Sequence, residues 1–387
     1  MTVGREDRLL LRAALRDGHD ALDAWNQWRA LVDLDAISWP SLRLVPLLWH
    51  NLVELGVQDV EMERYRTVFR QMWLAGQSRL LALRRVEAAL AERGVQTLVL
   101  KGVALAHGYY HSPGFRPMDD LDVLIRPADA PAAAGALRDA GWSTLYERPE
   151  RVLQVVHAQE FRDSRGTILD LHGHLFQGSL HSSLDAERWS RAERLELADG
   201  PLRVLDPTDQ LLHVLVHGAE SDPPAPRWVA DATIILRRRG PDVDWSRLVA
   251  DAEAESRGVA LTTSLAELSE ILPEVTAGAA AVALDALRGV RRSRSDRLEA
   301  RVAAGWRLFL IRRPLERVVD HRRWRRSGGA ARRRTGLLGY LALNWDADGS
   351  AAMVGNFVRR GFGALARDLR ASVQRLGVRR RSNPAHH

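Results

Sequence analysis

Two aspartates, Asp120 and Asp122, have the type and spacing of a cation site and lie in the run R-P-M-D-D-L-D-V-L-I. They are two residues apart, so both carboxylates project from the same face of a β-strand. Two carboxylates held this close repel each other, and a divalent cation removes the repulsion. Mg²⁺ with bound phosphates is the usual partner of such an oxygen pair. Asp119 is out of phase with this pair on a strand, and we exclude it from the metal ligands.

Upstream of the aspartates, Lys101 and Gly102 form a candidate phosphate-binding turn. Lys101 is the single lysine of a chain whose other Lys/Arg positions are all arginine. A compact ammonium at a turn that leads into a helix suits a phosphate, and chance retention of one lysine is the alternative. Gly102 would let a phosphate approach backbone N–H groups. Arg116, in the loop before the aspartates, is expected to pair with a phosphate oxygen or to tie the loop to Asp119.

The elements that must position these residues follow from the apolar pattern. Residues 95–100 predict a buried strand, 103–110 a helix and 121–125 a second strand, so the candidate carboxylates lie at the entrance of that second strand. Downstream, 155–162 and 167–175 predict a hairpin across a four-residue turn.

The second arm of this hairpin carries Asp170, His172 and His174 on one alternating face. His172 is expected either to orient a substrate or metal-bound group, or to belong to a polar strand face. A zinc site made from all three is disfavoured, because ligands on one extended strand are too widely spread to close a tetrahedron.

The L-K-G run, the helix after it and the D-D-L-D run resemble the core motif of the DNA polymerase β-like nucleotidyltransferase superfamily. They are most similar to bacterial nucleotidyltransferase family proteins with the signature LKG…R…D(I/L)D, over residues 95–235. The resemblance implies that the Gly102 turn holds nucleotide phosphates and that Asp120 and Asp122 bind two Mg²⁺ ions. It also implies a third carboxylate, and Asp170, in a D-L-H sequence, stands at that position. Asp170 would complete the metal shell or accept the proton of an attacking hydroxyl.

The same resemblance singles out His217, Trp228 and Asp231, which repeat an H…W…D order on helices that wall the nucleotide pocket in the family. Considered by itself, Asp231 is equally well explained as a first-turn acid favoured by the helix dipole. His213 and His217 have the i, i+4 spacing of a helical metal pair. The glutamate that follows the first histidine in zinc peptidases is absent, which favours packing or capping.

Composition limits the class and the compartment of the protein. The chain has 387 residues, 46% hydrophobic and 27% charged, as in an ordinary globular protein. It has no cysteine, which excludes disulfides, thiolate metal sites and cysteine catalysis. The first residues lack the apolar segment of a signal peptide, and no run approaches the ~20 apolar residues of a membrane span. We therefore expect a cytoplasmic protein without a transmembrane segment.

The net charge of +7 is unevenly distributed, because the segment from Arg288 to Arg381 contains 25 arginines and 7 acidic residues. Arginine clusters interleaved with aromatics suit RNA, DNA or an anionic membrane surface, and the stretches near Arg312 and at 357–369 are amphipathic. Residues 288–387 therefore predict contact with a polyanion. A solvated helical face in an arginine-biased chain is the plain alternative.

The elements together predict an α+β protein, a polymerase β-like core with a mixed sheet flanked by helical regions. A long helix is expected at 61–93, a short one at 131–140, and a strand at 142–146. The expected division is a helical region 1–93, a catalytic core 94–205, a helical domain 206–287 and an arginine-rich helical region 288–387 with a disordered tail.

The predicted activity is Mg²⁺-dependent transfer of a nucleoside monophosphate from an NTP such as ATP to an acceptor hydroxyl, with release of pyrophosphate. The acceptor class, whether small molecule, peptide or RNA, stays open. One alternative is a nucleotide-binding or regulatory protein that keeps the fold without the chemistry. Another is a toxin-like transferase that modifies RNA and grips it with the basic region.

Overall fold

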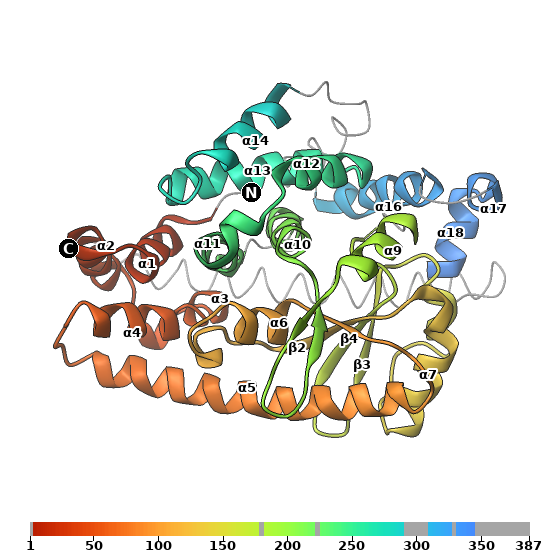
Figure 1. Ribbon diagram of the computed structural model, residues 1–387, viewed down its shortest axis with the longest axis horizontal. Helices are drawn as coiled ribbons and strands as arrows, with labels where there is room; N and C mark the ends of the chain where they lie inside the picture. Colours follow the sequence, from red (N-terminus) through yellow and green to blue (C-terminus); the bar gives the residue numbers. More distant parts are fainter. Residues whose placement is uncertain (1–2, 178–181, 221–224, 290–308, 327–329, 345–387) are drawn as a thin grey trace, which may run out of the picture.

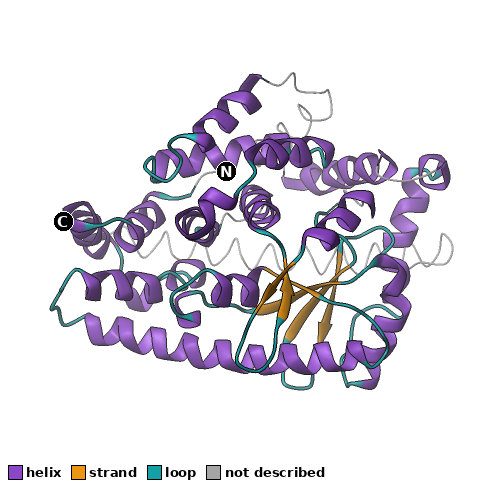
Figure 2. Cartoon of the chain, in the orientation of Figure 1, coloured by secondary structure: helices purple, strands orange, loops and turns teal. Residues whose placement is uncertain are grey.

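The computed structural model describes residues 3–177, 182–220, 225–289, 309–326 and 330–344 (Figure 1). Most of this part of the chain is helical, and its strands gather in one region with helices around them (Figure 2). Within these ranges, no helix combines the length and the apolar character needed to span a membrane.

Six strands in the described ranges form one mixed sheet in the order β3-β4-β2-β1-β6-β5. β2 runs antiparallel to β1 and parallel to β4, and β1 runs parallel to β6. The outer pairs, β3 with β4 and β5 with β6, are antiparallel. The bounds are β1 Leu98–Leu100, β2 Asp120–Leu124, β3 Ala158–Arg162, β4 Ile168–His172, β5 Glu193–Leu195 and β6 Leu202–Val204. This confirms the predicted α+β architecture with a mixed sheet.

The register of the central strands decides which polar residues meet. Asp122 of β2 lies opposite Leu100 of β1 on one side and opposite Asp170 of β4 on the other. The predicted hairpin is present as β3 and β4. Its turn is closed by the Asp163 carboxylate, which accepts hydrogen bonds from the backbone N–H groups of Arg165 and Thr167. A short side chain that accepts from the following backbone is what favours aspartate in such turns.

Helices precede the sheet and continue between its strands. Helix α5 runs along the base of the molecule beneath α4, α6 and the sheet (Figure 1), and it matches the long helix predicted at 61–93. Gly94 follows it with φ +71°, a conformation that glycine adopts without steric cost. The bounds are α1 Arg5–Leu15, α2 Gly18–Leu31, α3 Trp39–Leu42, α4 Val45–Glu54, α5 Met62–Ala91, α6 Lys101–Gly108, α7 Ala130–Asp139 and α8 Pro149–Val152.

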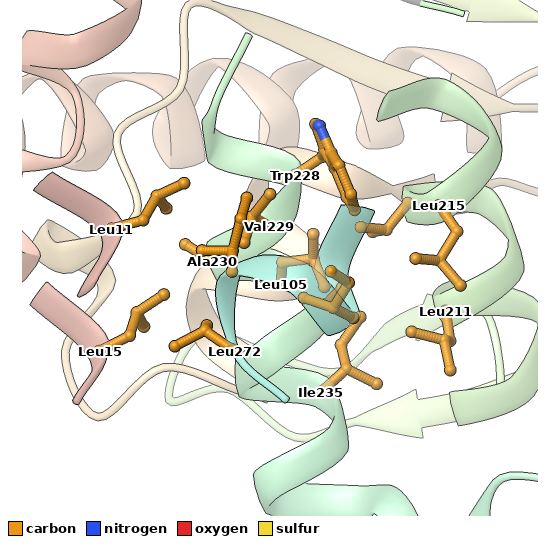
Figure 3. Packing of buried hydrophobic residues seen from close by; sticks show 14 of the residues in the cluster. Leu11, Leu15, Leu105, Leu211, Leu215, Trp228, Val229, Ala230, Ile235 and Leu272 are labelled. Atoms are coloured by element: carbon orange, nitrogen blue, oxygen red, sulfur yellow. The ribbon is translucent and has the colours of Figure 1, made fainter. Parts of the chain in front are cut away.

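A second group of helices covers the opposite side of the sheet from α5 and shares its core with the first helices of the chain. Leu11 and Leu15 of α1 pack in one cluster with Leu105 of α6, Leu211 of α10 and Ile235 of α11 (Figure 3). The bounds are α9 Ser182–Arg191, α10 Pro207–Glu220, α11 Arg227–Arg239, α12 Trp245–Ala254, α13 Gly258–Ile271 and α14 Ala279–Gly289. One hydrophobic core thus joins helices that precede the strands in the chain with helices that follow them. The four-part domain division stays a prediction.

Two local expectations were wrong. The predicted strand at 142–146 is reduced to an isolated bridge between Ser143 and Arg162. The chain bends at Leu145 and Glu147, and Pro149 begins α8, so the extended run ends soon after Ser143. The predicted turn at Lys101 and Gly102 is instead the first turn of α6, which begins directly after β1.

The described C-terminal helices are α16 Phe309–Arg326, α17 Ala330–Arg334 and α18 Leu337–Asn344. Trp324 and Tyr340 form a small cluster with Val155, just before β3, and the Trp324 indole N–H donates to the Gln154 carbonyl. These helices therefore contact the loop that leads into the hairpin. Part of the arginine-rich region lies outside the described residues. The cluster at 291–294, the segment at 357–369 and the predicted tail lie entirely outside them.

Candidate functional site

Two strands and one helix bring a set of ionisable side chains together at the centre of the sheet. Asp122, Asp170 and His172 each offer a ligand atom, and these atoms lie within 4.8 Å of one another. The cause is the parallel pairing of β2 with β4, which sets Asp122 directly beside Asp170. His172 follows two positions along β4, on the same face of the strand. Two neighbouring strands therefore assemble the cluster.

Asp122 is the most heavily contacted carboxylate of the cluster. Its Oδ1 atom accepts from Lys101 Nζ at 2.9 Å and lies 3.1 Å from His172 Nε2. Burial alone would raise the pKa of Asp122, but the Lys101 charge and His172 outweigh it and hold this pKa well below its usual range. The side chain is therefore ionised at neutral pH, and no described residue donates to its second oxygen, Oδ2.

The other two aspartates have the opposite tendency. Burial, opposed by the charge of His172 and reinforced by the charges of Asp122 and Asp120, raises the pKa of Asp170 to about 6. Burial and the neighbouring Asp122 likewise raise the pKa of Asp120, against the charges of Lys101 and two arginines. Asp120 stands on the same face as Asp122 but outside the 4.8 Å group, at the partly exposed start of β2. The site thus concentrates more negative charge than its own cations offset.

Lys101 is bound to a carboxylate instead of presenting an unpaired ammonium to solvent. It opens α6 with φ +36°, a left-handed conformation that costs a non-glycine residue about 1–3 kcal/mol. The strained residue delivers its Nζ atom to Asp122. Gly102 lies beside the start of β2, where an added Cβ would be 3.5 Å from Met118 Cβ and 3.6 Å from the Asp120 carbonyl oxygen. That is ordinary contact, so protein packing does not explain the glycine.

Arg116 does neither of the two things expected of it. Its guanidinium makes a bidentate pair with Asp231, at 3.1 Å from Nε to Oδ1 and 2.9 Å from Nη2 to Oδ2, and Tyr110 donates to the same carboxylate at 2.8 Å. Asp119 is paired with Arg43 instead. The preceding Gly114 lies flush against α5, where a Cβ would stand 2.6 Å from the Phe69 ring.

This close approach fixes the loop, and Arg116 is directed toward α11. Arg116 and Asp231 consequently form a buried pair that commits the Nε and Nη2 atoms of Arg116 to this carboxylate.

Four histidines gather near the carboxylates. The rings of His157 and His172 meet edge to face at 5.3 Å, and those of His213 and His217 at 6.4 Å. The Lys101 charge, together with burial, lowers the pKa of His217 to about 3. Burial lowers the pKa values of His157 and His213 well below the usual range. The two helical histidines are thus uncharged at neutral pH, and within the described residues they belong to no group of three or more potential metal ligands.

Two further residues from the sequence analysis have packing roles. Trp228 is buried in the main core, and its ring lies so close to Gly218 that a Cβ there would stand 2.2 Å from it. His174 points away from the cluster, with its Nδ1 atom 2.6 Å from Asp185. Arg188, on the same helix α9 as Asp185, also pairs with that carboxylate. The disfavoured zinc combination of Asp170, His172 and His174 is accordingly not assembled.

Three residues near the site carried no signal in the sequence. His157 precedes β3, Arg43 follows α3, and Arg227 opens α11, so each reaches the site only through tertiary packing. No local periodicity marks such positions. The H-x-x-x-H spacing on α10 was the one visible hint that histidines gather here.

The donor set fits a divalent cation. Two carboxylates and an imidazole converge, Asp122 Oδ2 has no partner among the described residues, and the buried His172 Nδ1 has none either. Carboxylates suit Mg²⁺ and Mn²⁺, and an imidazole suits transition metals. An ion held here would also offset the charge that raises the pKa of Asp170.

Comparison with known proteins places this site in a family. No curated protein matches the sequence. Among solved structures, the chain is similar to an antigenic nucleotidyltransferase-like protein from Paracoccidioides brasiliensis, with 13% identity, a TM-score of 0.32, and coverage of 56% of this chain and 92% of that chain. A family model described as an uncharacterised nucleotidyltransferase matches residues 19–271, which include the whole sheet and the helices on both sides of it. The chain belongs to this family of uncharacterised nucleotidyltransferases.

Proposed function

We propose that this protein transfers a nucleoside monophosphate from an NTP to an acceptor hydroxyl with the help of divalent cations, within the polymerase β-like superfamily. One observation carries the proposal: Asp122, Asp170 and His172 converge within 4.8 Å beside the first turn of α6. Metal-binding carboxylates next to a helix start are what phosphoryl transfer requires, because its catalysis is mainly positioning and charge neutralisation.

Asp122 and Asp170 would hold the first ion, and Asp120, at the entrance, would share a second with Asp122. Mg²⁺ held by these carboxylates would neutralise phosphate charge. His172 fixes the orientation of the Asp122 carboxylate from within the sheet. Lys101 balances Asp122 before substrate binds and lies at the helix start, where a phosphate would be received.

The bond changes assign a role to Asp170. The acceptor oxygen attacks the α-phosphorus, the bond from that phosphorus to the bridging oxygen breaks, and pyrophosphate leaves with the electron pair. The acceptor proton would pass to the carboxylate of Asp170, which lies beside Asp122.

Pyrophosphate release with each NTP, Mg²⁺ or Mn²⁺ and a cell extract tests the proposal. Asp122→Asn and Asp170→Asn should each lower turnover by at least about 100-fold, because each removes a charge that phosphoryl transfer needs. Asp139→Asn is the matched control, since that carboxylate is 67% exposed and pairs with Arg93 away from the sheet. Turnover retained by Asp122→Asn would refute the metal assignment.

The same incubation with α-³²P-labelled NTPs separates the alternatives and identifies the acceptor. Label on a small molecule, a peptide or an RNA names the acceptor class. NTP binding with no pyrophosphate release from any extract would favour a nucleotide-binding protein without transfer chemistry.

A further inference from the structure

Three guanidinium groups meet beside the loop that leads into β2. Arg43, which follows α3, donates from Nη2 to the Pro117 carbonyl oxygen at 3.3 Å. Arg227, the first residue of α11, donates from Nη1 to the same oxygen. Arg116 lies one residue before Pro117 in the chain. The N-terminal helices and the helices after the sheet therefore each contribute a cation to a point three residues from Asp120.

The carboxylates nearby do not balance these charges. Arg116 is paired with Asp231, and Arg43 with Asp119 at 2.7 Å from Nη1 to Oδ2. Within the described residues, no carboxylate oxygen lies within 4.0 Å of Arg227. Burial, followed by the charges of Arg116 and Arg43, lowers the pKa of Arg227 to about 9. The environment thus destabilises the charged form of Arg227, and an anion bound next to it would stabilise that form.

The location of the uncompensated charge indicates what kind of anion it receives. Arg43 and Arg227 both act electrostatically on Asp120, at the outer end of the carboxylate cluster. If ions at Asp122 and Asp170 held the α-phosphate of a nucleotide, Arg43 and Arg227 would offer cations to the β- and γ-phosphates on the Asp120 side of the cluster. A guanidinium fork matches two phosphate oxygens at once, which an ammonium does not.

We infer that Arg227, with Arg43 beside it, forms a polyphosphate-binding site that receives the β- and γ-phosphates of the nucleotide and then the pyrophosphate product. The assignment of the anion to a nucleotide rests on the proposed function. The anion site itself rests on the absence of a carboxylate partner for Arg227 among the described residues and on the shared contact at Pro117. A purely structural role, holding the Pro117 carbonyl, is the competing explanation, and it predicts no effect on ligand affinity once the fold is intact.

Binding of inorganic tripolyphosphate in EDTA, measured by calorimetry, tests the site without metal and without turnover. Arg227→Gln should bind about 10- to 100-fold more weakly than wild type, as expected for the loss of a charge-assisted contact. Arg227→Lys should recover part of that loss, because it restores the charge without the fork. Arg238→Gln is the matched control, an exposed arginine on the same helix, and should bind as wild type does. Circular dichroism establishes that each variant is folded.

The outcomes separate this inference from the proposed function. Wild-type tripolyphosphate affinity in folded Arg227→Gln overturns the anion site, even if NTP turnover continues. If Arg227→Gln fails to fold, Arg43→Gln and Arg227→Lys take its place, and wild-type affinity in both overturns the site equally. Weaker binding by the arginine variants, together with full turnover in Asp122→Asn, supports the anion site and refutes the transfer mechanism. With turnover present, the site predicts a raised KM for NTP in Arg227→Gln and a smaller change in kcat.

Discussion

Replacing Arg116 by methionine should destabilise the fold more than it alters nucleotide binding. Arg116 and Asp231 have side chains only 5% and 6% exposed, and they share two hydrogen bonds. Removing the guanidinium leaves the Asp231 carboxylate buried with Tyr110 as its hydrogen-bond donor. Breaking a buried pair from one side typically costs about 3–5 kcal/mol. We expect a loss of that order in the free energy of unfolding.

Urea unfolding followed by circular dichroism measures this loss, and a double-mutant cycle isolates the pair. Arg116→Met with Asp231→Asn removes both charges, so the double variant should recover part of the stability, with a coupling of about 1–3 kcal/mol. Arg162→Met is the control, because its pair with Glu160 is half exposed and should contribute less than about 1 kcal/mol. A folded Arg116→Met protein of wild-type stability that binds NTP poorly would refute this reasoning and return Arg116 to the phosphate site.

Three other changes have outcomes set by the geometry. Lys101→Met should bind Mn²⁺ more tightly in calorimetry, by about tenfold, because the ammonium that competes for the Asp122 carboxylate is gone, and weaker binding would contradict the pairing. In EDTA, Asp170→Asn should raise the urea midpoint at pH 8. The raised pKa of Asp170 means that the wild-type folded state loses stability as pH rises from about 4 through 6, so this advantage should shrink toward pH 4; an advantage independent of pH would contradict the assignment. Gly218→Ala should cost about 1–3 kcal/mol in urea unfolding, since its Cβ would overlap the Trp228 ring, whereas Gly4→Ala, with open space around it, should cost far less.

Periodicity in the sequence was enough to predict the central strands and the hairpin. The alternation that puts Asp120 and Asp122 on one face is a property of any extended strand. The turn before Thr167 could be predicted because its residues, at 163–166, are types that favour turns. The neighbouring position of Asp170 came from the family resemblance, and the parallel pairing of β2 with β4 supplies its physical basis.

Partners distant in sequence could not be predicted. Asp231 is 115 positions from Arg116, and no local sequence pattern around either residue predicts that the two pair. The contact of Arg43 and Arg227 with Pro117 likewise depends on how the helices before and after the strands pack together. The strand expected at 142–146 is reduced to one bridge because the chain bends at Leu145 and again at Glu147, before α8 begins at Pro149.

The hydrophobic cluster that joins α1 to α10 and α11 limits which gene fragment could carry the proposed chemistry from one protein to another. A gene fragment encoding only the sheet would carry the three aspartates, but it would expose the apolar faces that those helices cover. It would also lack Arg43 from one flank and Arg227 from the other. Recombination could therefore move this sheet between proteins only as a block reaching from α1 to at least α13, a block that extends beyond the family match at residues 19–271 by including α1.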